Sequence, residues 1–166
     1  MLPHSIADWS SFFSTAAEAA ATLAGLVIVT VSVNIRQILN YDHLPSRAAA
    51  AVGTLILILV SGIAALIPQP VHTFAIEILV MGAVAWLLQV HSTRKGTVAR
   101  LKLQRPTRES VLEIVSGQLQ TLPFIVGGII LLSGRGGGLY WIAGGIIAIF
   151  IFSTLNTWVL LVEILR

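Results

Sequence analysis

The chain contains no cysteine and few charged residues. None of its 166 residues is Cys, and Asp, Glu, Lys and Arg together make up only 10%. The lack of Cys excludes a disulfide framework and a thiolate metal site. Low charge, a hydrophobic content of 56% and a mean hydropathy of +0.92 exclude a water-soluble globular domain, because too little polar surface is available to cover the apolar part. The composition therefore indicates an integral membrane protein.

Motifs of catalytic and cofactor-binding sites are also missing. The glycine-rich segment 134–138 is not preceded by a strand or followed by Lys-Ser or Lys-Thr, so it is not a phosphate-binding loop. No serine lies in a nucleophile elbow. The four histidines show neither the H-x-x-H nor the H-x-x-x-H spacing of a metal site. The sequence predicts no enzymatic activity, no cofactor and no metal site.

Five apolar segments are long enough to cross a bilayer, which takes about 20 helical residues. They cover residues 12–35, 48–67, 71–90, 111–132 and 139–165. We therefore predict an all-α integral membrane protein, a compact bundle of five transmembrane helices in a single domain of residues 1–166. Pro68 and Pro70 end the second segment and predict a tight hairpin. Ser110 and Glu113 form a capping box at the start of the fourth segment.

Arg and Lys are distributed unevenly between these segments. The first and third connections carry eight of the ten, and six of these lie in the basic loop 91–108. Because positively charged loops stay in the cytoplasm, the pattern predicts an extracytoplasmic N-terminus and a cytoplasmic C-terminus. Basic residues at membrane-loop positions, without interleaved aromatics, favour anionic lipid headgroups over nucleic acid as the partner. The six candidates for headgroup contact are Arg94, Lys95, Arg100, Lys102, Arg105 and Arg108.

The fourth segment is the least apolar of the five. Its first half contains Glu113, Gln118 and Gln120, and only residues 122–132 form an unbroken apolar run. A re-entrant segment here would leave four crossings and move the C-terminus outside. The five-crossing arrangement is favoured, because a C-terminus on the outside would not fit the distribution of Arg and Lys between the two sides.

Polar and small residues of the first segment lie along one helical face. Alternating steps of four and three residues join Ser11, Thr15, Glu18, Thr22, Gly25, Val29, Ser32 and Arg36. One interpretation is close helix packing, which the small-xxx-small pattern of Ala17, Ala21 and Gly25 also favours. The other is a hydrated path or symmetry axis, with Glu18 as its titratable or ion-binding group. The candidate pathway residues are Glu18, Thr22, Thr15 and Glu77.

Glu77 enters that set because it lies at about the same depth as Glu18. Each is five or six residues from the outer end of its segment, which corresponds to roughly 7 to 10 Å at the helical rise. If their helices touch there, the two carboxyls could share a proton or hold a cation. The alternative is that each extends to the surface or bonds to a neighbouring hydroxyl.

An inner belt of amide side chains is expected nearer the basic loops. It comes from four different segments and consists of Asn34, Gln89, Gln118 and Asn156. Amides at such positions usually join helices by hydrogen bonds, each worth about 0.6 kcal/mol. A polar vestibule is the alternative.

These features favour a homo-oligomeric channel or transporter-like protein, since five short-looped helices enclose little volume and a shared axis would supply the missing cavity. The alternative is an accessory or assembly subunit of a larger membrane complex, in which the same polar residues dock onto other proteins. The Trp9-x-x-Phe12 start and the Ala- and Gly-rich middle of the first segment resemble those of small bacterial membrane proteins. This resemblance implies a multi-pass protein of a bacterial inner (plasma) membrane.

Overall fold

A computed structural model describes residues 6–39, 44–102, 107–134 and 137–164 of the protein. These residues form an all-helical bundle with five helices long and apolar enough to cross a membrane, which confirms that part of the prediction. The five helices are α1 (Ser10–Val33), α3 (Leu44–Leu66), α4 (Val71–Lys102), α5 (Thr107–Leu132) and α6 (Gly138–Ile164). A 3₁₀ turn, Ile6–Trp9, precedes α1, and the short helix α2, Ile35–Leu39, follows it.

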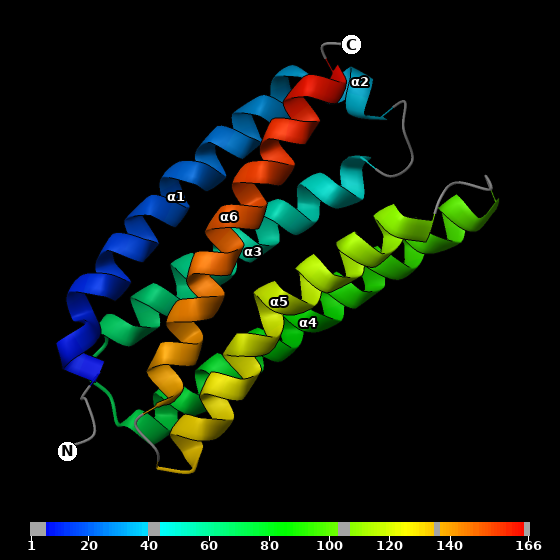
Figure 1. The fold of residues 1–166 in the computed structure, drawn as a ribbon. Helices are drawn as coiled ribbons and strands as arrows, with labels where there is room; N and C mark the ends of the chain where they lie inside the picture. Colours follow the sequence, from blue (N-terminus) through cyan, green and yellow to red (C-terminus); the bar gives the residue numbers. More distant parts are fainter. Residues whose placement is uncertain (1–5, 40–43, 103–106, 135–136, 165–166) are drawn as a thin grey trace.

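The helices pack mainly in neighbouring pairs (Figure 1). α1 packs along α3, α4 along α5, and α5 along α6, while α3 also contacts α4 and α6. The start of α1 and the end of α6 lie at opposite ends of the bundle, as an odd number of crossings requires. We call the end with Arg36 and Arg94, where α4 ends and α3 begins, the basic end. The opposite end, where α3 ends, α4 begins and α5 ends, is the hairpin end.

Helix α4 is longer than the sequence predicts. It continues from Val71 to Lys102, and α5 already begins at Thr107, so most of the predicted basic loop 91–108 is helical. The prediction was wrong because charge marks where a helix leaves the hydrocarbon and does not end it. Arg and Lys are good helix formers, and the next proline after Pro70 is Pro106.

Helix α5 is continuous over its whole length. It runs through Pro123 to Leu132, so the fourth segment is long and apolar enough for a full crossing. Ser110 lies inside this helix, three residues after its start at Thr107, and the predicted capping box is therefore not at the helix terminus.

Glycines of α5 allow close contact with both of its neighbours. A Cβ atom on Gly127 would lie 2.7 Å from Ile142 Cγ1 of α6, and one on Gly128 would lie 2.6 Å from Leu79 Cγ of α4. Small residues bring transmembrane backbones together in this way, which replaces the hydrophobic driving force that is absent in lipid. α5 is thereby held between α4 and α6.

The contact between α1 and α3 depends on small residues as well. The buried face of α1 consists of Phe13, Ala16, Ala17, Ala20, Ala24 and Val27. A Cβ atom on Gly62 of α3 would lie 2.9 Å from Ala17 Cβ and 2.9 Å from the backbone oxygen of Phe13. The two backbones can approach this closely only because Gly62 has no side chain.

Aromatic rings join three helices at the hairpin end. The Trp9 ring lies 4.9 Å from that of Tyr140 at the start of α6, and the Phe13 ring lies 6.0 Å from that of Phe74 on α4. Both pairs are edge-to-face, the geometry that the ring quadrupoles favour. This cluster attaches the beginning of α1 to α4 and α6.

The contact at Gly62 predicts a position-specific loss of stability. Gly62→Val should destabilise the protein by about 1–3 kcal/mol, because the added carbons have to push α1 away from α3. Gly53→Val is the matched control on the same helix, where a Cβ atom meets nothing within 4 Å. The midpoint of thermal unfolding in mild detergent measures both variants. Equal midpoints would contradict the close contact at Gly62.

Candidate functional site

The polar face of α1 points away from the rest of the bundle. Seven of its residues belong to α1 and Arg36 follows on α2, and all eight are exposed: Ser11, Thr15, Glu18, Thr22, Gly25, Val29, Ser32 and Arg36. We call this set the α1 stripe. Of the predicted small-xxx-small pattern, Ala17 is buried against α3, whereas Ala21 and Gly25 are exposed. Packing within the chain thus uses the alanine face of α1 and leaves the stripe outside.

Hydroxyl groups along the stripe bond within their own helix. Thr15 Oγ1 donates to the Ser11 carbonyl and Thr22 Oγ1 to the Glu18 carbonyl, both at 2.9 Å. Ser14 Oγ donates to Glu18 Oε1 at 3.1 Å. Each hydroxyl has one proton to donate but keeps lone pairs that can accept. The stripe therefore presents hydroxyl and carboxylate oxygens to its surroundings, with the hydroxyl protons already engaged.

Glu77 lies in a different environment. It is half-buried, and its Oε2 accepts a hydrogen bond of 2.8 Å from Gln69 Nε2. The same nitrogen donates to the Ala64 carbonyl at 3.0 Å, which also accepts from the Ile67 backbone N–H at 3.3 Å near the end of α3. Each carboxylate thus has a partner close to it in sequence: a hydroxyl of α1 for Glu18, and the amide of the α3–α4 turn for Glu77.

The four amides of the predicted inner belt do not form one group: two lie between α4 and α5, one at the end of α1 and one on α6. Gln118 Oε1 accepts a 2.7 Å hydrogen bond from Trp86 Nε1, which links α5 to α4. Gln89 lies over Gly117, where a Cβ atom would come within 2.6 Å of its Nε2. These two amides connect α4 to α5, Gln118 by a hydrogen bond and Gln89 by packing on Gly117. Asn34 Nδ2 donates to the Thr30 carbonyl at 3.0 Å within α1, and Asn156 is half-buried on α6.

Several buried polar residues had no part in the sequence prediction of the site. They are Thr54, Ser61, Gln120, Thr121 and Ser153. The hydroxyls of Thr54, Ser61 and Thr121 donate to carbonyls of their own helices. Ser153 Oγ is buried without a hydrogen-bond partner. Isolated hydroxyls in apolar runs look alike in sequence, and only the packing distinguishes the buried ones.

Most of the basic residues predicted to lie in the loop 91–108 instead belong to α4. Arg94 is exposed and lies three residues beyond His91. Lys102 is about 17 Å further along the helix than His91 at the helical rise. The backbones of Lys95, Arg100, Lys102 and Arg108 are helical, whereas Arg105 lies outside the described residues. Arg94 is therefore the predicted headgroup contact nearest to the apolar part of α4.

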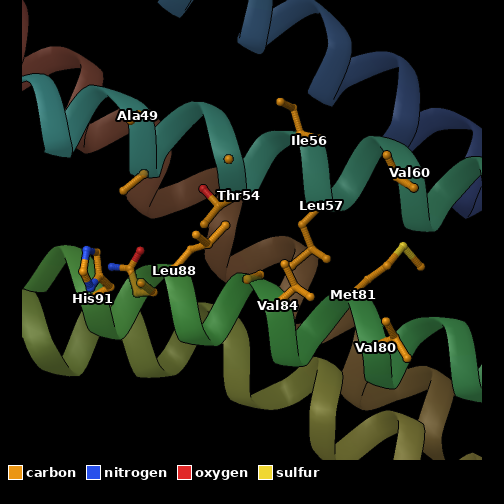
Figure 2. A pocket seen from close by; sticks show the side chains of 14 residues that line it. Ala49, Thr54, Ile56, Leu57, Val60, Val80, Met81, Val84, Leu88 and His91 are labelled. Carbon is orange, nitrogen blue, oxygen red and sulfur yellow. The ribbon is translucent and has the colours of Figure 1, made fainter.

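The described part of the bundle carries two cavities with similar linings. One, of about 560 Å³, lies between α3 and α4 (Figure 2). The other, of about 550 Å³, lies against α5 and α6 near Tyr140 and Trp141. Apolar side chains form most of the lining of both. Among the residues that the structure describes, no three His, Asp or Glu side chains come together in a group that could hold a metal ion.

Comparisons with protein-family models, with curated proteins and with solved structures found no match to this chain. The candidate site consequently rests on the geometry of α1 and its surroundings.

Proposed function

We propose that this chain forms a homo-oligomeric channel or transporter in a bacterial plasma membrane, in which the α1 stripe of each copy faces a shared axis. The observation that carries the proposal is the exposure of the whole stripe on the outer surface of a single chain. A membrane helix that turns its polar face away from its own bundle needs another polar surface, or water, to cover that face.

The cost of leaving the stripe in lipid supports this. Glu18 lies about two turns into α1 and is exposed. Insertion scales assign about 2.5–3.5 kcal/mol to a charge at the bilayer centre, which is an upper bound for Glu18 at its shallower depth. One hydroxyl from Ser14 offsets only part of that cost. A second copy of α1 that packs at Gly25 and leaves water at the level of Glu18 would remove most of it.

The cavities of the single chain support the same proposal. Both cavities described above have apolar linings, so neither offers an ion a polar route through one copy. A route between copies requires only the surface that α1 already presents.

The chemistry of the stripe favours cations or protons over anions. Thr15, Thr22 and Ser32 donate their hydroxyl protons to carbonyls of α1 and keep oxygen lone pairs. Together with the Glu18 carboxylate, these oxygens form a row of acceptors. Hard cations take oxygen ligands of this kind, and oxygen acceptors accept hydrogen bonds from water or hydronium in the same way.

The alternative is an accessory subunit that docks α1 onto a larger membrane complex. Large apolar residues on the same side of the molecule favour it: Leu26, Val29 and Val33 are 58%, 61% and 77% exposed. A mixed polar and apolar surface of this kind suits a protein partner as well as a second copy. The oligomeric state of the purified protein distinguishes the two.

The first prediction concerns orientation. Arg36 and Arg94 lie at the basic end, so we expect this end, and with it the C-terminus, in the cytoplasm and the N-terminus outside. Reporters active on only one side of the membrane, fused to either terminus, should report opposite compartments. If both termini report the same compartment, the five-crossing arrangement is wrong.

The second prediction concerns self-association. Gly25→Leu should convert the oligomer to monomers, because a bulky residue in the stripe prevents close approach of two α1 helices. A Cβ atom on Gly25 meets nothing within 4 Å in its own chain, so the fold itself should tolerate the change. Gly144→Leu, at an equally open glycine of α6, is the control and should leave the mass unchanged. Light scattering in mild detergent measures the mass, and a strictly monomeric parent protein would exclude the shared axis.

The third prediction concerns Glu18. In vesicles reconstituted with the parent protein, Glu18→Gln should lower cation or proton flux by about tenfold, which corresponds to about 1.4 kcal/mol in barrier height. Glu77→Gln makes the same chemical change where the carboxylate is tied to Gln69, and it should have little effect on flux. An unchanged flux in Glu18→Gln, or no flux from the parent, would favour the accessory-subunit function.

A further inference from the structure

The cavity between α3 and α4 is an elongated groove (Figure 2). On α3 its lining runs from Ala49 to Val60, and on α4 from Val80 to His91. Both stretches are about 16 Å long at the helical rise. Much of the wall is exposed, since Val84 and Leu88 are 52% and 64% exposed. The groove is therefore open to the surroundings of the bundle along its side.

Hydrogen bonds join α3 and α4 at the hairpin end, beyond the groove. At the hairpin end, the Gln69 amide connects the Ala64 carbonyl of α3 to the Glu77 carboxylate of α4. Along most of their length, α4 packs mainly against α5 and α3 mainly against α1, and the contact between α3 and α4 is less extensive than either (Figure 1). Gly53 lines the groove, and a Cβ atom on it would meet nothing within 4 Å.

Polarity along the groove changes in one direction. Its length is lined by aliphatic side chains such as Leu57 and Val84, and the Thr54 hydroxyl is engaged with the Ala51 carbonyl. Gln89 and His91 lie at the end nearest the basic end, and the exposed Arg94 follows one turn later. An apolar groove that ends at amide, imidazole and guanidinium groups matches an amphiphile with an anionic head.

We propose that this groove binds one acyl chain of an anionic phospholipid from the leaflet at the basic end, with the lipid phosphate beside His91 and Arg94. The length supports this occupant, because 16 Å is close to half of the roughly 30 Å hydrocarbon core. A transmembrane helix of a second copy would need a surface about twice as long, and the lining of the groove ends at Val60 and Val80. The proposal does not involve the α1 stripe, so either proposal can fail without the other.

A photoactivatable phospholipid with a diazirine on its acyl chain tests the proposal. The full chain is reconstituted in vesicles of phosphatidylcholine that contain a trace of the probe with a phosphatidylglycerol head, and labelled peptides are identified by mass spectrometry. Labelling should concentrate on the groove-facing residues of α3 and α4. Gly53→Leu should lower it by about tenfold, because the new side chain fills the space that the acyl chain occupies. Gly144→Leu on α6 is the matched control and should leave labelling of α3 and α4 unchanged.

The headgroup is tested by exchanging the probe. A phosphatidylcholine probe should label the groove less than the phosphatidylglycerol probe does, and Arg94→Gln should reduce that preference by about fivefold, the usual effect of one cation near an anionic headgroup. Arg36→Gln is the control, since Arg36 belongs to α2, which packs against α1 and α3. If Gly53→Leu does not fold, Leu88→Trp fills the same groove from α4.

Three results would overturn the proposal. Labelling spread evenly over all lipid-facing helices would identify ordinary surrounding lipid. Undiminished labelling in Gly53→Leu would place the acyl chain elsewhere. Cross-links from groove residues to a second copy of the chain would identify a protein interface in place of a lipid site.

Discussion

The close contact between α1 and α3 determines which surface the protein presents to its surroundings. α1 lies against Gly62 of α3 with the face that carries Phe13 and Ala17. Any larger residue in place of Gly62 would collide with this face of α1. Once this alanine face is buried, the polar face lies on the other side of α1 and stays outside. The exposure of Glu18 is thus a consequence of the packing, and the proposed shared axis depends on it.

Glycines of the described helices fall into two groups, those packed against a neighbouring helix and those that face open space. Gly62, Gly117, Gly127 and Gly128 lie where neighbouring helices touch, and a Cβ atom on any of them would collide with a neighbour. Gly25, Gly53 and Gly144 lie on helices with nothing within 4 Å of such an atom. The first group holds the bundle together without a hydrophobic driving force. The second group marks surface that is left free, and Gly25 and Gly53 lie in the α1 stripe and the α3–α4 groove respectively.

The two proposed surfaces have opposite chemistry. The α1 stripe offers hydroxyl and carboxylate oxygens, which are costly in lipid and suit a wet or protein-covered position. The groove offers aliphatic side chains and becomes polar only near Gln89 and His91, which suits an amphiphile. A single chain can carry both because α3, in contact with α1 on one side and α4 on another, separates them.

The sequence alone determined the number of crossing helices and their approximate limits, because each crossing needs about 20 apolar residues and the backbone in hydrocarbon has to bond internally. It also identified Glu18 as the one charge within the first apolar segment and placed it on a polar face. It could not predict that α4 continues to Lys102, since charged residues leave a helix intact. Only the tertiary structure decided that the α1 stripe faces outward, that Trp86 bonds to Gln118, and that a groove lies between α3 and α4. Helical periodicity assigns residues to a face, but which neighbour covers that face depends on contacts between helices that are distant in the chain.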